Sequence, residues 1–403
     1  MRGLSRRENP LNGGAKRKIR IGVAGLGRGF TLSLPMLARD PRVTLVAAAD
    51  LRPQARAQFA REFSAKVYDN VEALCADPNV EVVYVATPHE HHVAHAALAA
   101  AHGKHLLIEK PMAIKLADCE AMIAAALKAG VQLMVGPSHS FDAHIARTRA
   151  LIESGAYGAV RMIAALNYTD FMQRPRRPEE LDTAQGGGVV FSQGAHQVDI
   201  VRLLGGGRVK TVRAATGAWD RERPSEGAYA ALLTFEQGTF ASLSYGGYGH
   251  FDSDEFQGWT GELGQRRKPG TAKPRARFAT PADEIAAKDA RNYGGSAYSP
   301  AATEDLQHEH FGTFIVSCES ADLRPLPNGV MIYRDGAGTL DPLPPPAVPR
   351  SEVIDELYAA VVHGRPPLHS GAWAMATLEV CLAMLESARE GRDVPLDHQV
   401  GLP

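Results

Sequence analysis

Two side chains of the 403-residue sequence have the types and surroundings that alcohol oxidation needs. Lys110 stands between Glu109 and Pro111, directly after an apolar run, and His196 lies in a glycine-rich segment. The reaction requires a base for the hydroxyl proton and a cation that holds the developing alkoxide. Lys110 suits the cation, and beside an oxidised nicotinamide its pKa should be lowered, so it could also relay the proton. His196 is the predicted base, because an imidazole titrates near neutral pH.

A glycine-rich turn and a later carboxylate predict a dinucleotide site. Segment 22–27 has the sequence GVAGLG and ends the first apolar run of the chain. Bare backbone lets a pyrophosphate approach there, and the N-terminus of the following helix favours its charge. Asp50 ends the second apolar run, where a carboxylate can accept hydrogen bonds from the adenosine ribose. Phe30 occupies the position of the third glycine, so helix and strand must pack differently there.

The same residues favour NAD as the cofactor. A carboxylate at Asp50 repels the 2′-phosphate of NADP, although Arg52 could accommodate that phosphate, so NADP stays possible. Residues that end the apolar runs at 80–87 and 104–108 emerge at the carboxyl edge of the predicted sheet, where ligands bind in open α/β folds. The predicted cofactor-binding residues are Gly25, Gly27, Arg28, Gly29, Phe30, Asp50, Arg52, Thr87, Pro88, His89, His92, Glu109 and Lys110.

No metal site is predicted. His91 and His95 have the i, i+4 spacing of two helical metal ligands, within a cluster of four histidines at 89–95. A zinc-protease motif would require a second histidine where Val93 stands. The four cysteines are scattered singly, which excludes both a Cys-x-x-Cys zinc site and a disulfide framework.

The elements that must position these residues follow from the apolar pattern of segment 18–138. Continuous Val, Ile, Leu and Ala runs are typical of parallel strands buried on both faces, and they lie at 19–24, 43–49, 80–87, 104–108 and 131–135. Segments 53–63, 91–102 and 116–129 are long enough for crossover helices. The pattern predicts an α/β Rossmann domain, a doubly wound parallel sheet, over 18–138. A flexible arm at 1–17 is expected before it.

Residues 139–403 are expected to form a second, α+β domain with a large, mostly antiparallel sheet. Alternating segments lie at 160–168, 209–216, 228–235 and 239–245, after a helical stretch at 143–154. Helical patterns return at 352–363 and 372–389. A polar stretch at about 251–299 is interpreted as a solvated insertion, with a lid or an oligomer contact as the alternative.

Composition restricts the ligand to a small molecule. Lys and Arg number 44 against 45 Asp and Glu, so no overall field attracts nucleic acid or an anionic membrane. No stretch approaches the roughly 20 apolar residues that span a bilayer. Single cysteines are typical of reduced thiols. We therefore expect a cytoplasmic protein without nucleic-acid or membrane partners.

Several of these segments together resemble the glucose-fructose oxidoreductase/inositol dehydrogenase/MocA (Gfo/Idh/MocA) family. They are the glycine-rich turn, Ala-Thr-Pro with a following histidine at 86–92, Glu-Lys-Pro at 109–111, and the Gly-Gly-Gly segment that leads to His196. The resemblance covers nearly the whole chain. It implies an NAD(P)-dependent oxidoreductase that forms a homodimer or homotetramer, and a His92 that holds its loop and helix.

One position departs from the family pattern. In sugar-oxidising members an aspartate commonly stands four residues before the histidine that corresponds to His196, and here that residue is Ser192. On a helix Ser192, His196 and Asp199 share one face, so the line of contact is kept while its first charge is lost. This leaves His196 a weaker base and argues against a plain polyol substrate. The predicted substrate-binding residues are His139, Arg174, Arg176, Ser192 and Asp199.

Segments 168–178 and 248–255, with Ser192, resemble the branch that contains 4,5-dihydroxyphthalate dehydrogenase-like enzymes and cis-dihydrodiol dehydrogenases of aromatic carboxylates. The resemblance implies hydride transfer from a ring carbinol carbon to NAD, giving a ketone that enolises to a catechol. Arginines at 174, 176 and 177 could bind a ring carboxylate bidentately, or simply form a basic surface loop.

Three other functions stay open. A sugar or inositol dehydrogenase fits Lys110 and His196 but not the missing aspartate. An NAD-dependent glycoside hydrolase would use the cofactor as a transient oxidant and release no net NADH. A regulator that senses dinucleotide without catalysis fits the fold, although Lys110 at the cofactor edge weighs against it.

Overall fold

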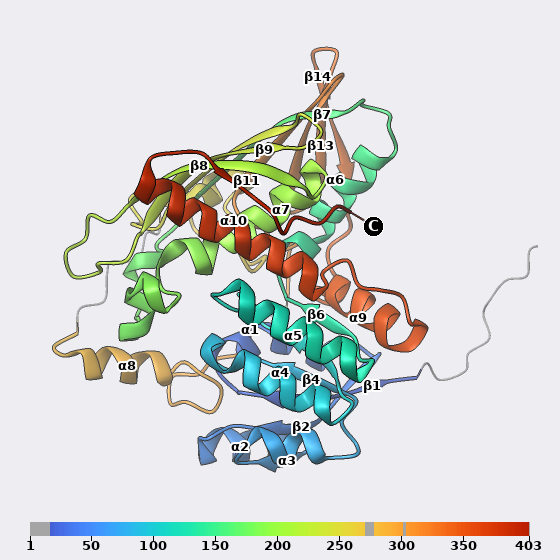
Figure 1. The fold of residues 1–403 in the computed structure, drawn as a ribbon, viewed down its shortest axis with the longest axis vertical. Coiled ribbons are helices and arrows are strands. Elements are labelled where there is room, and N and C mark those ends of the chain that lie inside the picture. The colour runs from blue at the N-terminus through green and yellow to red at the C-terminus, as the bar shows by residue number, and fades with distance from the viewer. Residues whose placement is uncertain (1–16, 271–277, 301–303, 403) are drawn as a thin grey trace, which may run out of the picture.

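The computed structural model describes residues 17–270, 278–300 and 304–402, which form two sheets with helices packed on them (Figure 1). Helix α10 (Gly371–Glu390) crosses between the two sheets. Apart from Arg17, the predicted N-terminal arm at 1–17 lies outside the described residues, as does part of the polar stretch at 271–277. Within the described ranges, no helix is long and apolar enough to cross a membrane.

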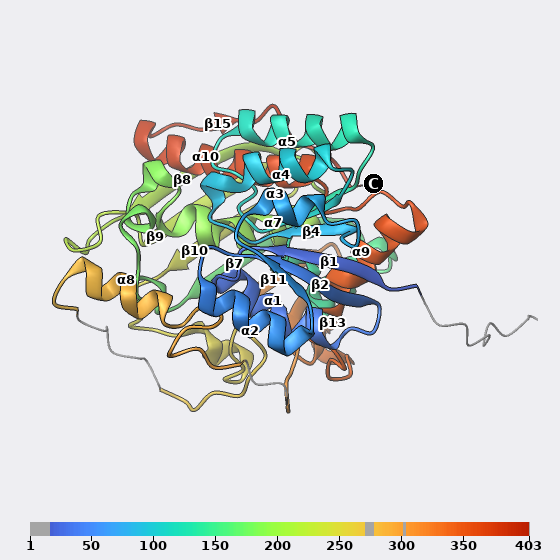
Figure 2. The ribbon, with the colours of Figure 1, turned by 90° about the horizontal axis from the view of Figure 1, so that it is seen from below.

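The N-terminal sheet is wholly parallel, with strand order β3-β2-β1-β4-β5-β6. Its strands are β1 (Ile19–Ala24), β2 (Val43–Ala49), β3 (Lys66–Tyr68), β4 (Val82–Val85), β5 (His105–Ile108) and β6 (Leu133–Val135). Figure 2 shows α1 (Arg28–Arg39) and α2 (Pro53–Phe63) on one face, with α3 (Val71–Ala76), α4 (His92–Ala101) and α5 (Leu116–Ala129) on the other. Helices on both faces bury these strands, which is why they are continuously apolar. The predicted doubly wound fold is confirmed.

The position of the ligand crevice follows from this strand order. The order reverses between β1 and β4, so the loops after these strands diverge and leave a crevice at their carboxyl ends. Gly25, the first residue after β1, has φ +92°. A Cβ at this position would lie 2.9 Å from the carbonyl oxygen of Ala86. Only glycine therefore fits the turn that opens the crevice.

The second sheet has nine strands in the order β14-β13-β12-β11-β7-β10-β9-β8-β15. They are β7 (Val160–Tyr168), β8 (Val209–Gly217), β9 (Ala228–Phe235), β10 (Phe240–Gly246), β11 (Thr313–Cys318), β12 (Asp322–Leu326), β13 (Gly329–Arg334), β14 (Ala337–Pro342) and β15 (Val394–Pro395). All pairs are antiparallel except β7 with β10. This confirms the mostly antiparallel sheet, although the sequence analysis predicts no strand in 313–342.

The C-terminal helices join the two halves of the molecule. Helices α7 (Ala195–Gly205) and α10 pack with the inner face of the nine-stranded sheet in one apolar core. Helix α9 (Ser351–His363) instead buries Val353, Ile354 and Leu357 in the core on the α1–α2 face of the parallel sheet. Helix α6 (Ala143–Glu153) packs on α7 and on strands β12 and β13. The crevice at the carboxyl edge of the parallel sheet is thereby held against the second sheet.

The polar stretch at 251–299 is not the solvated insertion that its composition predicts. Its described part contains a short 3-10 helix (Ser253–Gln257) and α8 (Pro281–Asp289). Tyr293 is fully buried, with its ring centroid 5.2 Å from that of Phe30 and 6.3 Å from that of Phe59. Its hydroxyl donates to Glu62 at 2.5 Å. The segment is therefore anchored on the α1–α2 face of the parallel sheet by one aromatic residue.

Candidate active site

The glycine turn after β1 has the shape of a dinucleotide cradle. A Cβ at Gly27 would meet no atom within 4 Å, so the backbone is open on that side. At Gly29 a Cβ would lie 3.2 Å from the Glu109 carboxyl group, so this glycine lets α1 approach the end of β5. Gly29 therefore allows the close helix–strand contact that the third glycine of the motif normally allows. The motif places that glycine at position 30, where this sequence has Phe30.

Phe30 does not present its side chain to the cofactor. The ring is fully buried and packs on Phe59 and Tyr293. The prediction of a cofactor contact is corrected for this side chain, because α1 turns it toward the core behind the crevice. Its backbone amide, in the first turn of α1, still faces the N-terminal end of the helix.

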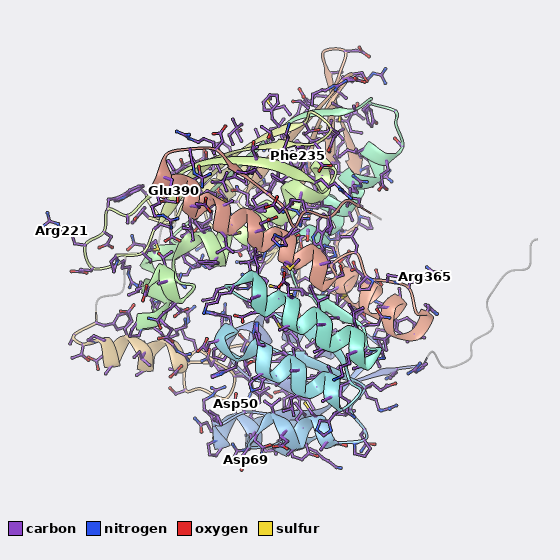
Figure 3. The ribbon with its side chains drawn as sticks, in the orientation of Figure 1. Asp50, Asp69, Arg221, Phe235, Arg365 and Glu390 are labelled. Atoms are coloured by element: carbon purple, nitrogen blue, oxygen red, sulfur yellow. The ribbon has the colours of Figure 1, made fainter. Side chains whose placement is uncertain are left out.

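Asp50 and Arg52 lie together at the carboxyl end of β2 (Asp50 is labelled in Figure 3). The Asp50 carboxylate accepts hydrogen bonds from the backbone amides of Leu26 and Arg52, each at 2.8 Å. The Arg52 guanidinium donates to Asp50 at 3.0 Å, to the Leu26 carbonyl at 2.8 Å and to the Tyr293 carbonyl at 3.1 Å. These bonds tie Arg52 to the protein instead of leaving it open to a 2′-phosphate, which favours NAD.

The loop after β4 is held by two histidines. His92 is buried, with Nε2 2.9 Å from the Thr87 carbonyl and Nδ1 3.1 Å from the Met112 carbonyl. Its ring therefore ties the loop after β4 to the loop after β5, as the resemblance implies. His89 Nε2 lies 2.9 Å from the carbonyl of Gln185 in the other half of the molecule. Pro88, between them, directly precedes the 3-10 helix His89–His91.

Lys110 follows β5 and reaches across to the second half of the molecule. Its ammonium donates to the carbonyl of Ser192 at 2.9 Å. Burial lowers the pKa of Lys110, while the neighbouring Glu109 and Glu262 oppose that shift. Glu109 is held in turn by the hydroxyl of Tyr84 and by the backbone amide of Lys110 at 3.3 Å. The ammonium is thus fixed in a largely water-free site, where its charge acts strongly on a nearby oxygen.

His196 lies in α7 beside Lys110 and is only 6% exposed. Its Nδ1 is 3.3 Å from the hydroxyl oxygen of Ser138. Burial, with the positive charges of Lys110 and His139, places the pKa of His196 well below its usual value. At neutral pH the imidazole is therefore uncharged and can accept a proton in a hydrogen bond, as a base must.

Ser192 does not contact His196 through its side chain. Residues Val190–Gly194 form a π-helix, in which i and i+4 do not share a face as they do in an α-helix. The Ser192 hydroxyl donates to the Gly188 carbonyl at 2.5 Å, while its own carbonyl accepts from Lys110. The predicted line of contact through residues 192, 196 and 199 is therefore wrong, and Ser192 acts on the site through its backbone.

Asp199 is a buried anchor. Its carboxylate accepts hydrogen bonds from Ser140 at 2.5 Å, from the indole of Trp373 at 2.5 Å and from Thr377 at 3.3 Å. These bonds join α7 to α10 and to the segment after β6. The predicted substrate contact is corrected, because both carboxylate oxygens already have protein partners.

His139 carries the charge that His196 lacks. Its Nδ1 is 2.8 Å from Asp142 and its Nε2 is 3.5 Å from Glu262. Burial lowers the pKa of His139, but the opposing effect of the two carboxylates is larger and raises this pKa to about 9. The rings of His139 and His196 meet edge to face, with centroids 4.9 Å apart. One neutral and one protonated imidazole therefore lie side by side.

The three arginines that could bind a ring carboxylate differ in their surroundings, and Arg177 is paired with Asp289 at 2.6 Å. Arg176 stacks 3.5 Å over the Phe171 ring and donates to the Phe171 carbonyl at 2.6 Å, so it is a packed residue. Arg174 is paired with Asp170 at 2.9 Å and its side chain is 40% exposed. Burial lowers the pKa of Arg28, and the neighbouring cations Arg291 and Arg174 lower it further. Positive charge thus gathers beside the crevice around Arg28 and Arg174.

The sequence analysis missed four charged residues beside the site: Asp142, Glu262, Glu309 and Arg350. Arg350 lies 2.7 Å from Glu309, and both side chains are buried. Ligand atoms of His139, Asp142 and Glu309 lie within 4.8 Å of one another. Arg350 already supplies a cation for these carboxylates, so we assign no metal to them. Asp142 lies only three positions after His139, whereas Glu262, Glu309 and Arg350 come from distant parts of the chain that no local pattern links to the site.

Comparison with known proteins shows the family to which the chain belongs. A model described as "Oxidoreductase family, NAD-binding Rossmann fold" matches residues 19–137, and one described as "GFO/IDH/MocA C-terminal domain" matches residues 145–258. The chain belongs to the Gfo/Idh/MocA family. It is thus an NAD(P)-dependent oxidoreductase, as the resemblance implies.

Relatives of this Gfo/Idh/MocA enzyme include two kinds of diol dehydrogenase. A 1-carboxy-3-chloro-3,4-dihydroxycyclohexa-1,5-diene dehydrogenase of Comamonas testosteroni is 46% identical over 92% of this chain and 95% of its own. The trans-1,2-dihydrobenzene-1,2-diol dehydrogenase of Sus scrofa is 33% identical over 49% of this chain and 59% of its own. A solved structure of a presumed dehydrogenase from Bordetella bronchiseptica RB50 has a TM-score of 0.88 at 39% identity, covering 94% of this chain and all of that chain.

The residues of this Gfo/Idh/MocA enzyme fit NAD. The open backbone at Gly27, the N-terminus of α1 and the Asp50 carboxylate lie along the crevice in the order of pyrophosphate and ribose. Lys110 follows β5 at the same carboxyl edge of the sheet, and His196 lies beside it in α7. The cofactor, when bound there, accepts a hydride.

Proposed function

We propose that the enzyme oxidises a cis-dihydrodiol of an aromatic carboxylate, a carboxylated cyclohexadiene diol, to the corresponding catechol with NAD. The similarity to the Comamonas testosteroni enzyme, at 46% identity over 92% of the chain, carries the proposal. The site agrees with it: a buried ammonium and a neutral imidazole lie beside the nicotinamide position, with arginines at the mouth of the crevice.

Lys110 and His196 have separate tasks in this proposal. The Lys110 ammonium donates a hydrogen bond to the substrate oxygen and stabilises the charge that develops there. The neutral imidazole of His196 accepts the hydroxyl proton while the carbinol carbon gives its hydride to NAD. The resulting ketone enolises to the catechol. Because aromatisation drives this step, a base as weak as His196 is sufficient.

Arg174 is the proposed partner of the substrate carboxylate. Its side chain is part-exposed beside the crevice, whereas the guanidinium of Arg176 is committed to Phe171. A guanidinium can bind a carboxylate bidentately. To do so, Arg174 would release the Asp170 carboxylate and bind the substrate carboxylate instead. His139 contributes through its positive charge rather than by a direct bond, since both of its nitrogens face carboxylates.

A substrate panel tests the proposed activity. Purified enzyme is mixed with NAD and either a carboxylated cis-dihydrodiol, myo-inositol or glucose, and NADH absorbance is followed. We expect NADH with the carboxylated diol and little with the two polyols. Reduction of NAD with inositol or glucose, but with no carboxylated diol, would show that the enzyme is a polyol dehydrogenase. Cleavage of a glycoside, added as a further substrate, without net NADH would point to an NAD-dependent glycoside hydrolase.

We also infer that the enzyme is a cytoplasmic homodimer or homotetramer. Cys75, Cys119 and Cys381 are buried free thiols, which suits a reducing compartment. The outer face of the nine-stranded sheet presents Met162 beside Phe240 on the paired strands β7 and β10, and both side chains are about 40% exposed. Such an apolar sheet face is the surface on which a second copy can pack.

A further inference from the structure

The segment 258–266 contributes the Glu262 carboxylate to the site. None of the sequence motifs that predicted site residues includes this segment. The backbone amide of Gly261 donates to Gln265 at 2.8 Å, and that of Gly264 donates to Gly261 at 2.8 Å, closing a tight hairpin. The carbonyl of Glu262 accepts from the His310 amide at 3.2 Å. Glu262 is therefore held at the tip of a hydrogen-bonded hairpin.

The side chain of Glu262 points at His139. The Glu262 carboxylate lies 3.5 Å from His139 Nε2 and is one third exposed, whereas His139 is almost fully buried. Asp142 occupies the other nitrogen at 2.8 Å. An imidazole with a carboxylate at each nitrogen donates an N–H to both, which requires its charged form. Glu262 thus fixes both the orientation and the charge of His139.

The surroundings keep Glu262 ionised. Burial raises the pKa of Glu262, but the opposing effect of His139 and Arg174 is larger and lowers this pKa to about 2. The charged and titratable groups that face it are His139, Arg174, Arg28, His310, Lys110, Arg350, Glu309 and Tyr245. Cations predominate among them, so a negative charge is stable at this position.

We propose that Glu262 supplies the carboxylate that is missing at Ser192, that it positions His196 through His139, and that it acts on Lys110 directly through its charge. The imidazolium ring that it orients packs edge to face on His196 at 4.9 Å, with 69° between the ring planes. The negative charge of Glu262 also helps Lys110 to stay an ammonium group in a buried site. No bond forms or breaks at Glu262. The role rests on the proposed function, because it concerns the same hydride transfer.

The isosteric variant E262Q tests this role, with E255Q on the same segment as the matched control, since Glu255 is exposed. We expect E262Q to lower kcat by about tenfold or more, with a smaller change in KM, because an orienting group is lost rather than a substrate ligand. The alkaline limb of the pH profile should move to lower pH, because Lys110 loses a stabilising anion. E262D should recover part of kcat, and E255Q should match the parent enzyme.

A measurement without substrate separates this proposal from the proposed function. Histidine NMR signals are titrated in the parent enzyme and in E262Q, with H139N used for assignment. The His139 imidazolium should persist toward pH 9 in the parent and titrate at lower pH in E262Q. An unchanged His139 titration overturns the role of Glu262 whatever the substrate. An E262Q profile that differs from the parent only in KM overturns it as well. If no carboxylated diol is oxidised, the proposed function fails, and the kinetic arm uses whichever alcohol the parent oxidises.

Discussion

Burial lowers the pKa of both Lys110 and His196, and the reaction needs the first protonated and the second neutral, which predicts a bell-shaped pH profile of kcat/KM. The pKa of His196 lies well below 6.5, so its protonation removes the base only as the pH falls through that lowered value. The pKa of Lys110 lies below 10.5, so the cation is lost as the pH rises through it. Activity should therefore stay high across neutral pH and fall on the alkaline side. A rate that keeps rising there would instead make Lys110 the base.

Replacing the ammonium tests its role directly. We expect Lys110→Ala to lower kcat by about 100- to 1,000-fold, the usual cost of removing one group that stabilises developing negative charge. NAD should still bind, which fluorescence titration of the cofactor can show. Lys115→Ala, at an exposed lysine five residues on, serves as the control. A fully active Lys110→Ala enzyme would favour a dinucleotide-sensing regulator.

Individual residues differ in how far the sequence predicts their place. Gly25, Asp50, Lys110 and His92 lie where the motif spacing puts them. Gly25 and Asp50 directly follow short, strongly apolar strands, Lys110 lies two residues after β5, and His92 begins α4 after the loop that follows β4. Ser192 was placed wrongly, because a π-helix changes the spacing of side chains without any mark in the residue types. Glu262 could not be predicted as a site residue, because only tertiary folding brings it to His139, more than 120 positions away.

At the scale of elements, five of the six parallel strands were predictable, whereas five of the nine strands that the structure describes in the second sheet were not. Strands β1 and β2 are buried on both faces and read as unbroken apolar runs, so their bounds are those predicted. Strands β11 and β12 bury alternate residues, but β12 includes Pro325 and β14 buries none of its residues, so the alternation along β11 to β14 is weak. Strand β3 has only three residues, too few for a period.

The anchoring of segment 251–299 by Tyr293 yields a stability prediction. Tyr293→Ala removes a fully buried ring between Phe30 and Phe59, which should cost about 3–5 kcal/mol, the range for large aromatic truncations in a core. It should also raise KM for NAD, because Arg52 bonds to the Tyr293 carbonyl beside Asp50. Urea unfolding and NAD titration measure the two effects.

Tyr293→Phe is the matched control for this variant. It keeps the ring and loses only the hydroxyl bond to Glu62, so its cost should be about 1 kcal/mol. Equal stability of the alanine variant and the parent would mean that the segment is not anchored at this residue.

At the scale of the molecule, the site exists only because two sheets and a hairpin converge. Lys110 follows the parallel sheet, His196 begins a helix of the second half, and Glu262 comes from the hairpin after β10. Composition and periodicity predicted the two sheets but not their contact, which depends on α10, whose side chains pack both in the core of the nine-stranded sheet and in a core of the parallel sheet.

The proposed assembly has its own test. Phe240→Glu places a charge on the outer sheet face, next to Met162. We expect light scattering to show a dimer or tetramer for the parent and a smaller species for the variant, because an unpaired carboxylate would be buried between copies. A monomeric parent would contradict the assembly and leave the active site, built within one chain, unaffected.

The most direct test of the central claim follows the hydride itself. A carboxylated cis-dihydrodiol carrying deuterium at its carbinol carbon is incubated with enzyme and NAD, and both products are analysed by mass spectrometry. The account predicts catechol and NADH in equal amounts, with the deuterium in the NADH. Catechol formed without deuterated NADH, or no turnover of the diol while a sugar reduces NAD, would contradict it.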